Sequence, residues 1–222
     1  MFDAELSMLL RQSNNSQYTV GGKTKRVFDV LVAIATLIAA LPLFFCVFIA
    51  LKLTDPGPVF YHHVRVGRGG RRFPCIKFRS MVVNSDEVLK SVLENDPERR
   101  DEWMRTQKLI NDPRITPMGQ FLRQSSLDEL PQLLNVIRGD MSLVGPRPIV
   151  PAEMPRYGDK LDLYLQARPG ITGIWQISGR NDCEYKKRIE MDANYVRHWS
   201  FAADISILIR TFVAVLTRKG SY

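Results

Sequence analysis

The sequence predicts an α+β fold in which a small, mostly helical domain contains a β-hairpin and is anchored by an N-terminal, Pro-kinked re-entrant membrane helix. Three observations support this prediction. An apolar run without any charge occupies residues 30–51. Two segments rich in β-branched and aromatic residues flank a glycine-rich turn. The chain has 222 residues, of which 45% are hydrophobic, so it is long enough to bury a core of its own.

The membrane anchor is expected at residues 23–55, after a flexible polar tail at 1–22. About 20 apolar residues are enough to cross the hydrocarbon core of a bilayer. Positive residues stay on the cytoplasmic side, yet Arg26 precedes the run and Lys52 follows it. Pro42, near the middle, removes a helix hydrogen bond. These features favour a helix–break–helix segment that enters the membrane and returns, with an ordinary kinked transmembrane helix as the alternative.

Residues 56–222 are predicted to form a cytoplasmic domain that begins with the hairpin. Its strands are expected at 59–66 and 73–80, around a loop of glycines and arginines. Lys77 and Arg79 are two residues apart, so a strand places both on one face. The loop arginines meet either lipid head groups or a substrate phosphate, or they are simply solvated.

Helical patterns dominate the rest of the chain. Residues 85–110 are charged and helical in pattern, with an interruption near Pro97, and further helices are expected at 118–123 and 184–199. The last helix, at 201–216, is strongly apolar and is followed by basic residues. It is expected to lie in the membrane interface or, as an equal alternative, against the core.

The net charge of the chain narrows the classes of molecule that it is expected to bind. The 31 lysines and arginines outnumber the 23 aspartates and glutamates and give a formal net charge of +8. Such a chain favours nucleic acid, an anionic membrane surface or a phosphorylated substrate. The three cysteines, Cys46, Cys75 and Cys183, lack the spacing of metal ligands and fit free thiols in a reducing compartment.

The chain is organised around residues 125–135, where Asp128 and Glu129 precede Pro131. Proline is tolerated near a helix start, which places both carboxylates in or beside a first turn. The exposed N–H groups there favour carboxylates and phosphates. Four arginines, Arg114, Arg123, Arg138 and Arg147, crowd the same region, and this combination suits phosphate chemistry, with or without a divalent cation. Ser126 and Glu129 also match a capping box, which is the structural alternative.

Further basic and aromatic side chains are candidates for binding. Arg147 stands between two prolines that hold it extended, so that its guanidinium is presented stiffly for a bidentate phosphate contact. Trp175 offers a flat face for a base or sugar, or else a buried core side chain. The candidate substrate-binding residues are Arg147, Lys77, Arg79, Arg114, Arg168, Arg180 and Trp175.

Six motifs in a fixed order carry a family resemblance. They are Lys25-Arg26-x-Phe28-Asp29, Asp55-Pro56-Gly57-Pro58-Val59-Phe60, Lys77-Phe78-Arg79-Ser80-Met81, Leu127-Asp128-Glu129-Leu130-Pro131-Gln132-Leu133, Gly145-Pro146-Arg147-Pro148 and Arg168-Pro169-Gly170-Ile171-Thr172-Gly173. From about Lys23 onward the chain resembles the bacterial sugar transferase family of monotopic phosphoglycosyl transferases, also called polyprenyl-phosphate hexose-1-phosphate transferases. It looks most like the undecaprenyl-phosphate galactose phosphotransferases of exopolysaccharide synthesis. Some members carry Ser-Pro at the membrane bend, where this chain has Leu41-Pro42.

The resemblance implies a specific reaction at the cytoplasmic face of the bacterial inner membrane. Galactose 1-phosphate or glucose 1-phosphate would pass from a UDP-sugar to undecaprenyl phosphate, with release of UMP. By the same resemblance, Asp128 is the nucleophile of a covalent phosphosugar intermediate and a ligand of the required Mg²⁺. Glu129 matches its partner, which supports either the metal or proton transfer, and Arg147 matches the arginine of the phosphate site. The membrane helix of the family is re-entrant.

The expected partners are therefore a UDP-sugar, undecaprenyl phosphate and inner-membrane lipid, without nucleic acid, and a homo-oligomer is compatible with the sequence. The alternative from another class is a non-catalytic, membrane-attached basic module that binds nucleic acid or acidic lipid. That module explains the charge and the anchor, but not a carboxylate pair among arginines.

Overall fold

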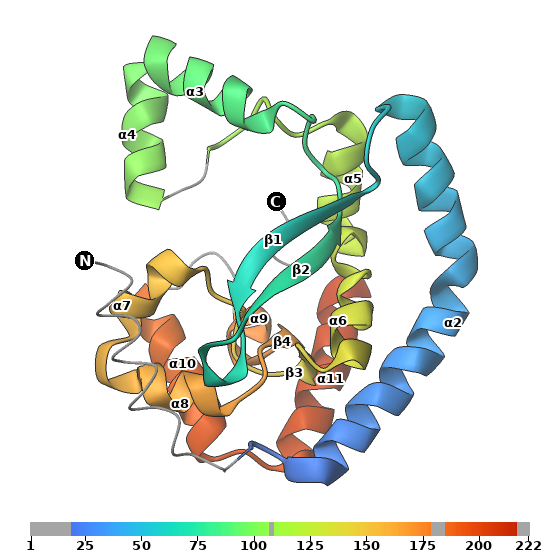
Figure 1. The fold of residues 1–222 in the computed structure, drawn as a ribbon, viewed down its shortest axis with the longest axis vertical. Coiled ribbons are helices and arrows are strands. Elements are labelled where there is room, and N and C mark those ends of the chain that lie inside the picture. The colour runs from blue at the N-terminus through green and yellow to red at the C-terminus, as the bar shows by residue number, and fades with distance from the viewer. Residues whose placement is uncertain (1–18, 107–108, 179–184, 217–222) are drawn as a thin grey trace.

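The computed structural model describes residues 19–106, 109–178 and 185–216 (Figure 1). Helix α2, Gly22–Thr54, curves along one side of the molecule, and the other elements form a body beside it (Figure 1). The described chain is mostly helical, with one antiparallel and one parallel two-stranded sheet. The predicted α+β class is confirmed.

The body elements follow in chain order. They are β1 (Phe60–Val66), η1 (Arg68–Gly70), β2 (Arg72–Phe78), α3 (Ser85–Asn95), α4 (Pro97–Thr106), α5 (Pro117–Gln124), η2 (Leu127–Glu129), α6 (Gln132–Arg138), β3 (Ser142–Val144), η3 (Pro151–Glu153), α7 (Met154–Tyr157), η4 (Gly158–Lys160), α8 (Leu161–Gln166), β4 (Gly170–Thr172), α9 (Ile174–Ile177), α10 (Tyr185–Arg197) and α11 (Phe201–Leu216), where η denotes a 3-10 turn. The predicted helices are confirmed within a few residues, including the interruption before Pro97 and the full extent of α11.

Helix α2 is long and apolar enough to cross a membrane. It is uninterrupted over 33 residues and keeps Pro42 inside it. The expected break into two returning arms is absent, because the helix continues through the proline and curves (Figure 1). One proline removes a single hydrogen bond, and the neighbouring turns can carry the helix past it as a bend.

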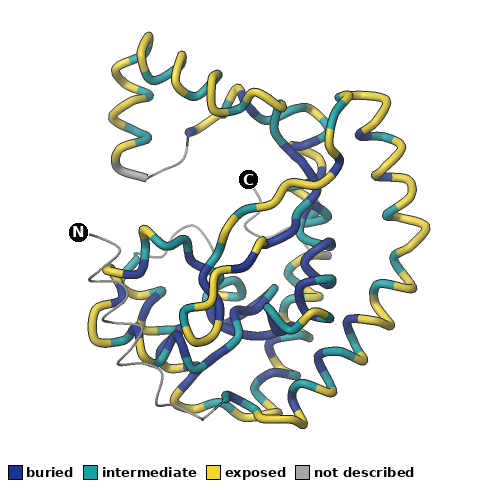
Figure 2. The backbone as a smooth tube through the Cα atoms, viewed as in Figure 1, coloured by how far each residue is buried: buried dark blue, intermediate teal, exposed yellow. Residues whose placement is uncertain are grey.

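Both ends of α2 pack on the same body. Near its start, Ala33 is buried in the main core, which includes residues of α6 and β3. Near its end, Val47 and Leu51 join a smaller core with Phe78 and Leu122. The side of α2 away from the body is exposed (Figure 2), and its large apolar side chains recur at helical spacing along one face. This exposed stripe consists of Val27, Leu31, Ile34, Ile38, Leu41, Phe45 and Phe48.

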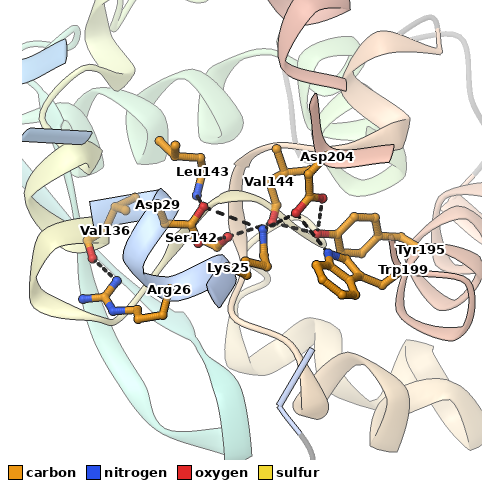
Figure 3. A network of polar contacts seen from close by, with 10 residues as sticks. All are labelled: Lys25, Arg26, Asp29, Val136, Ser142, Leu143, Val144, Tyr195, Trp199 and Asp204. Carbon is orange, nitrogen blue, oxygen red and sulfur yellow. Dashed lines mark hydrogen bonds and ion pairs between the residues drawn. The ribbon is translucent and has the colours of Figure 1, made fainter. Parts of the chain in front are cut away.

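A buried polar network fastens the start of α2 to the body (Figure 3). Lys25 Nζ donates to Asp204 Oδ2 of α11 at 2.6 Å and lies 3.7 Å from Asp29 Oδ1. Asp29 Oδ2 accepts from Ser142 Oγ of β3 at 2.6 Å. Two more groups donate to Asp204, the Tyr195 hydroxyl at 2.8 Å and Trp199 Nε1 at 3.0 Å. The network joins three segments that are far apart in the sequence.

The hairpin is confirmed, with β1 and β2 antiparallel and His63 opposite Cys75. Cross-strand partners share a face of a sheet, so one face of this hairpin carries His63, Arg65, Cys75 and Lys77. The final helix, α11, packs on the core at Ile207 and buries Asp204, while Phe212 and Val213 are exposed. Its place in the membrane interface stays a prediction.

Candidate active site

Asp128 and Glu129 lie in the turn η2, which connects α5 to the start of α6. The turn follows Ser126, whose φ of 56° is in the left-handed region. A residue other than glycine in this conformation costs of order 1–3 kcal/mol, and such strain clusters at functional sites. The Ser126 side chain makes no capping hydrogen bond, so the capping-box alternative is wrong. Glu129 bonds to a distant lysine instead.

That lysine is Lys77, at the end of the hairpin. Its Nζ lies 2.7 Å from Glu129 Oε1 and 3.6 Å from Asp128 Oδ2. Burial alone would lower the pKa of Lys77, but Glu129 and then Asp128 outweigh burial and hold its pKa above the ordinary value. Lys77 is therefore a stable cation between two carboxylates.

The Asp128 carboxyl is the more buried of the pair, with 8% of the residue exposed. Burial raises the pKa of Asp128 above its usual range, and the neighbouring Glu129 raises it further, against the lowering effects of Lys77 and Arg123. A desolvated carboxylate with a raised pKa is more basic than a solvated one. It suits the role of a nucleophile, provided that cations hold it ionised.

Arg123, at the end of α5, is the second cation beside Asp128. The Nε of Arg123 donates to Ser80 Oγ at 2.8 Å. Burial lowers the pKa of Arg123, and the negative charge of Asp128 acts in the opposite direction. The sequence placed Arg123 among the arginines near the carboxylate pair but did not assign it to the site. Its position five residues before Asp128, on the helix that leads into η2, is the signal that could have identified it.

A magnesium ion fits this donor set only with help from a substrate. Among the described residues, no three His, Cys, Asp or Glu side chains gather into a metal-ligating group. Mg²⁺ is commonly held by one or two carboxylates together with substrate phosphates, rather than by a cage of protein ligands. Asp128 and Glu129 are two adjacent carboxylates of this kind, so the residues fit a Mg²⁺ ion that arrives with a phosphorylated ligand.

A second cluster forms around Trp175 in α9. The guanidinium carbons of Arg147 and Arg188 lie 5.2 and 4.4 Å from the centroid of the Trp175 ring. Asp192 of α10 accepts hydrogen bonds from the Tyr157 hydroxyl at 2.8 Å and from the Arg147 backbone N–H. The structure thus brings the predicted Arg147 and Trp175 together and adds Arg188, which sequence reasoning missed.

The shared face of the hairpin connects the two clusters. Arg65 donates from Nη2 to His63 Nδ1 at 3.0 Å and from Nη1 to the Pro148 carbonyl at 3.1 Å, next to Arg147. Burial lowers the pKa of His63, and the positive charges of Arg65 and Lys77 lower it further. A neutral His63 therefore stands between the cations of the two clusters. Arg65, whose Nη1 also lies 4.0 Å from Glu153 Oε2, links the hairpin to the segment that carries Arg147.

The chain matches the family model described as bacterial sugar transferase over residues 20–218. It belongs to this family. It is 55% identical over 216 residues to an undecaprenyl-phosphate galactose phosphotransferase of Salmonella typhimurium, covering 97% of this chain and 45% of that protein. It is 48% identical over 219 residues to the exopolysaccharide production protein ExoY of Sinorhizobium fredii, covering 99% of this chain and 97% of that protein.

A third relative, the UDP-glucose:undecaprenyl-phosphate glucose-1-phosphate transferase of Xanthomonas campestris, is 40% identical over 206 residues, covering 89% of this chain and 40% of that protein. The chain spans about half the length of several curated relatives that it matches, and nearly all of ExoY.

In this sugar transferase, three predicted binding residues have partners other than the Asp128–Glu129 pair. Arg79 turns to the end of α2, where its Nη2 is 3.1 Å from Asp55 Oδ2. Arg114 pairs with Asp112 at 2.6 Å, and both lie close enough to influence the pKa of Arg123. Arg168 donates from Nε to the Gly139 carbonyl at 2.9 Å, beyond the far end of α6. Arg180 lies outside the described residues. Lys77 and Arg79 therefore serve different neighbours, although they are two residues apart.

Proposed function

We propose that this protein transfers a hexose 1-phosphate from a UDP-sugar to undecaprenyl phosphate, releasing UMP, as the first membrane step of exopolysaccharide synthesis. The observation that carries the proposal is the carboxylate pair Asp128–Glu129, bridged by Lys77 and flanked by Arg123. Membership of the bacterial sugar transferase family supports it. The names of relatives, which specify undecaprenyl phosphate and a sugar phosphate, support the same class of substrates.

The proposed reaction has two displacements at one phosphorus atom. A carboxylate oxygen of Asp128 bonds to the sugar-bearing phosphorus of the UDP-sugar, and the bond from that phosphorus to the bridging oxygen breaks, so that UMP leaves. A phosphate oxygen of undecaprenyl phosphate then attacks the same phosphorus. The bond to Asp128 breaks, which regenerates the carboxylate and yields the lipid diphosphosugar. Covalent catalysis of this kind replaces one difficult displacement by two easier ones.

The surroundings of Asp128 suit this role because an anionic nucleophile must approach an anionic phosphate. Lys77 and Arg123 place positive charge beside the carboxylate, where it offsets the repulsion and the charge that develops on the phosphoryl oxygens. Asp128 and Glu129 are the residues that would hold Mg²⁺, which would supply Lewis-acid stabilisation of the phosphate charge when bound.

The Trp175 cluster suits the rest of the donor. Arg147 and Arg188 present guanidinium groups that recognise phosphates, and the Trp175 ring provides a face for a base or a sugar. Asp192 holds the backbone of Arg147. We assign this cluster to the nucleotide end of the UDP-sugar and the Asp128 end to the sugar phosphate. Galactose is the sugar that we propose to test first, because the galactose relative is 55% identical and the glucose relative 40%.

We also propose that α2 is re-entrant, so that both of its ends lie at the cytoplasmic face of the inner membrane. A helix that crosses places its ends on opposite sides of a hydrocarbon core about 30 Å thick. Here Lys25 and Asp29 at one end, and Val47 and Leu51 at the other, are buried against one body. The exposed stripe between them would face the acyl chains, and the curvature of α2 replaces the expected break.

Cysteine labelling tests this placement. In a variant with Cys46→Ser and Cys183→Ser, we introduce Lys23→Cys or Thr54→Cys, both at exposed positions, and treat oriented membrane vesicles with an impermeant thiol reagent. The re-entrant arrangement predicts that both positions react from the same side. Labelling from opposite sides would establish a crossing helix.

The reaction itself is tested by UMP release from purified, detergent-solubilised protein. A panel of UDP-sugars is supplied with Mg²⁺, with and without undecaprenyl phosphate, and Lys186→Gln serves as an exposed control variant. Release that requires the lipid and prefers one sugar would support the proposal and identify the sugar. Absence of release with every sugar, from protein that is folded by circular dichroism, would favour a basic membrane-attached module without catalysis.

A further inference from the structure

A basic pocket that the proposed reaction does not use lies at the start of α2. It is open to solvent, with a volume of about 630 Å³. We call it the base pocket, because it lies at the base of α2, and the six of its nine lining residues that carry the argument are Lys23, Arg26, Val27, Arg68, Arg168 and Trp199. Four of the nine lining residues are cations, and none of the described residues that line the pocket is acidic.

The cations of the base pocket crowd one another. Burial lowers the pKa of Arg168, and the nearby positive charges of Arg68 and Arg26 lower it further. Arg26 donates to the carbonyls of Val136 and Ile137 at 2.5 and 2.9 Å, which orients its guanidinium without neutralising it. Asp29 acts on the pKa of Arg168 in the raising direction, but this carboxylate already pairs with Lys25 and accepts a hydrogen bond from Ser142. The pocket therefore has an excess of positive charge that an anion would relieve.

The base pocket is distinct from the catalytic carboxylates. Arg26 contacts the last turn of α6, whereas Asp128 precedes its first turn. Arg68 lies in η1 at the tip of the hairpin, and Lys77 lies near the other end of β2. At about 3.3 Å per residue, the strand from Arg72 to Lys77 alone spans roughly 17 Å. A ligand in the base pocket does not reach the reacting atoms.

The rim of the pocket points to the kind of anion. Val27 lines the pocket and is also the first residue of the exposed stripe on α2. Trp199 lines it as well, with its Nε1 committed to Asp204. Tryptophan is enriched where a protein meets the boundary between water and lipid. Positive charge beside an apolar stripe matches a molecule with an anionic head and an acyl tail.

We propose that the base pocket binds the phosphate head group of an anionic phospholipid, whose acyl chains extend along the exposed stripe of α2. This inference rests on the proposed membrane placement of α2 but not on the proposed reaction. The lipid would hold the start of α2 at the membrane surface, on the side where Lys25 fastens the helix to the body.

The test measures lipid binding to the purified full chain in detergent by native mass spectrometry. The probes are dioctanoylphosphatidylglycerol, its zwitterionic phosphatidylcholine counterpart and inorganic phosphate. The test variant is the double change Lys23→Gln and Arg68→Gln, because both side chains are exposed and their loss should leave the fold intact. The matched control is Lys186→Gln with Lys187→Gln, which removes the same charge from an exposed face of α10 outside the pocket.

Each basic residue near an anionic lipid surface contributes about 1 kcal/mol, so the double variant should bind phosphatidylglycerol roughly 30-fold more weakly. The control should change the Kd by less than about twofold, since its lysines are outside the pocket. Equal losses in both variants would overturn the proposal in favour of diffuse charge attraction. Equally tight binding of phosphatidylcholine, or of inorganic phosphate, would overturn it as well.

A parallel assay of UMP release separates this inference from the proposed reaction. Lipid binding without UMP release would contradict the reaction and leave the base pocket supported. UMP release without selective binding of phosphatidylglycerol would contradict the base pocket alone.

Discussion

Two clusters in this protein have the same composition, a lysine between two carboxylates, and different surroundings. In the cluster that fastens α2, the exposed fractions of the Lys25, Asp29 and Asp204 side chains are 7%, 3% and 2%. In the cluster at η2, those of Lys77, Asp128 and Glu129 are 30%, 11% and 40%. The first cluster is closed to solvent, and the second is open at the lysine and the glutamate.

Hydrogen bonding separates the two clusters further. Asp29 and Asp204 accept bonds from Ser142, Tyr195 and Trp199, which satisfy the carboxylate oxygens within the fold. Asp128 meets the cations Lys77 and Arg123 instead. A buried ion pair whose members are all bonded holds elements together, whereas a carboxylate surrounded by cations is prepared for an anionic ligand. The comparison teaches that accessibility and bonding, rather than residue type, distinguish a structural acid from a reactive one.

The strongest test of the comparison is Asp128→Asn, which should reduce UMP release by at least about a thousandfold, because an amide cannot act as the nucleophile. The melting temperature should change little, since Lys77 keeps Glu129 as a partner. Both quantities are measured on the same detergent preparation. Turnover near that of the unmodified protein, at equal protein concentration, would remove Asp128 from the proposed role.

The matching change in the closed cluster is Lys25→Met. It leaves two buried carboxylates without their cation, and breaking a buried pair in this way costs about 3–5 kcal/mol. We expect a large drop in the midpoint of thermal unfolding, which is measured by circular dichroism and light scattering. A midpoint equal to that of the unmodified protein would show that the network is not a structural fastening.

Lys77→Met should reduce activity much more than stability, the opposite of what we expect for Lys25→Met. The Lys77 side chain is nearly one-third exposed, so its loss should cost at most about 1 kcal/mol of stability. UMP release should fall roughly a hundredfold, the usual magnitude for removing one stabilising group from a charged transition state. Because the lysine lowers the pKa of Asp128, the acid limb of the pH–rate profile should move to higher pH. An unchanged acid limb would contradict the assigned contact.

Arg147→Lys tests whether the Trp175 cluster binds the nucleotide end of the donor. Lysine keeps the charge but loses the planar, bidentate guanidinium, so we expect kcat/KM for the UDP-sugar to fall about tenfold or more. The apparent KM for undecaprenyl phosphate should stay within about twofold, since the lipid meets the Asp128 end. Steady-state kinetics with each substrate varied in turn distinguish these effects, and a loss confined to the lipid KM would reverse the assignment.

The smallest expected effect concerns Asp192, which supports the backbone of Arg147. Burial raises the pKa of the Asp192 carboxyl to about 7, although hydrogen bonds from the Tyr157 hydroxyl and the Arg147 backbone act to lower this pKa. The folded state then binds a proton that the unfolded state releases near pH 4, so this group stabilises the protein at low pH and the contribution is lost as pH rises toward 7. Asp192→Asn should flatten this slope, which is at most about 1.4 kcal/mol per pH unit. Melting curves between pH 5 and 8 measure it, and parallel slopes in both proteins would contradict the assignment.

Much of the fold could be predicted because its signals are local. The uncharged run at 30–51 gave α2, the glycines between two β-branched segments gave the hairpin, and the apolar run at 201–216 matched α11 at both ends. Asp128 and Glu129 were found because they are neighbours in the sequence. Each of these predictions depends on residues within one turn or one hairpin, where backbone geometry and periodicity decide the outcome.

The fate of individual cations could not be predicted in this way. Lys77 donates a hydrogen bond to Glu129, 52 residues away in the sequence. Arg79 pairs with Asp55, and Arg168 lines the base pocket. Pro42 was expected to break the membrane helix, but α2 continues through it and packs on the body near both ends.

The sequence by itself therefore determined the elements, the adjacent carboxylate pair and the family resemblance. The tertiary structure alone decided which lysine lies beside Asp128, which acids are closed within the fold, and which residues line the base pocket, namely Lys23, Arg26, Val27, Arg68, Arg168 and Trp199 among others. The physical reason is that secondary structure follows from interactions between near neighbours in the chain. The partner of a charge is chosen by packing, which brings together side chains separated by as many as 179 positions, as with Lys25 and Asp204.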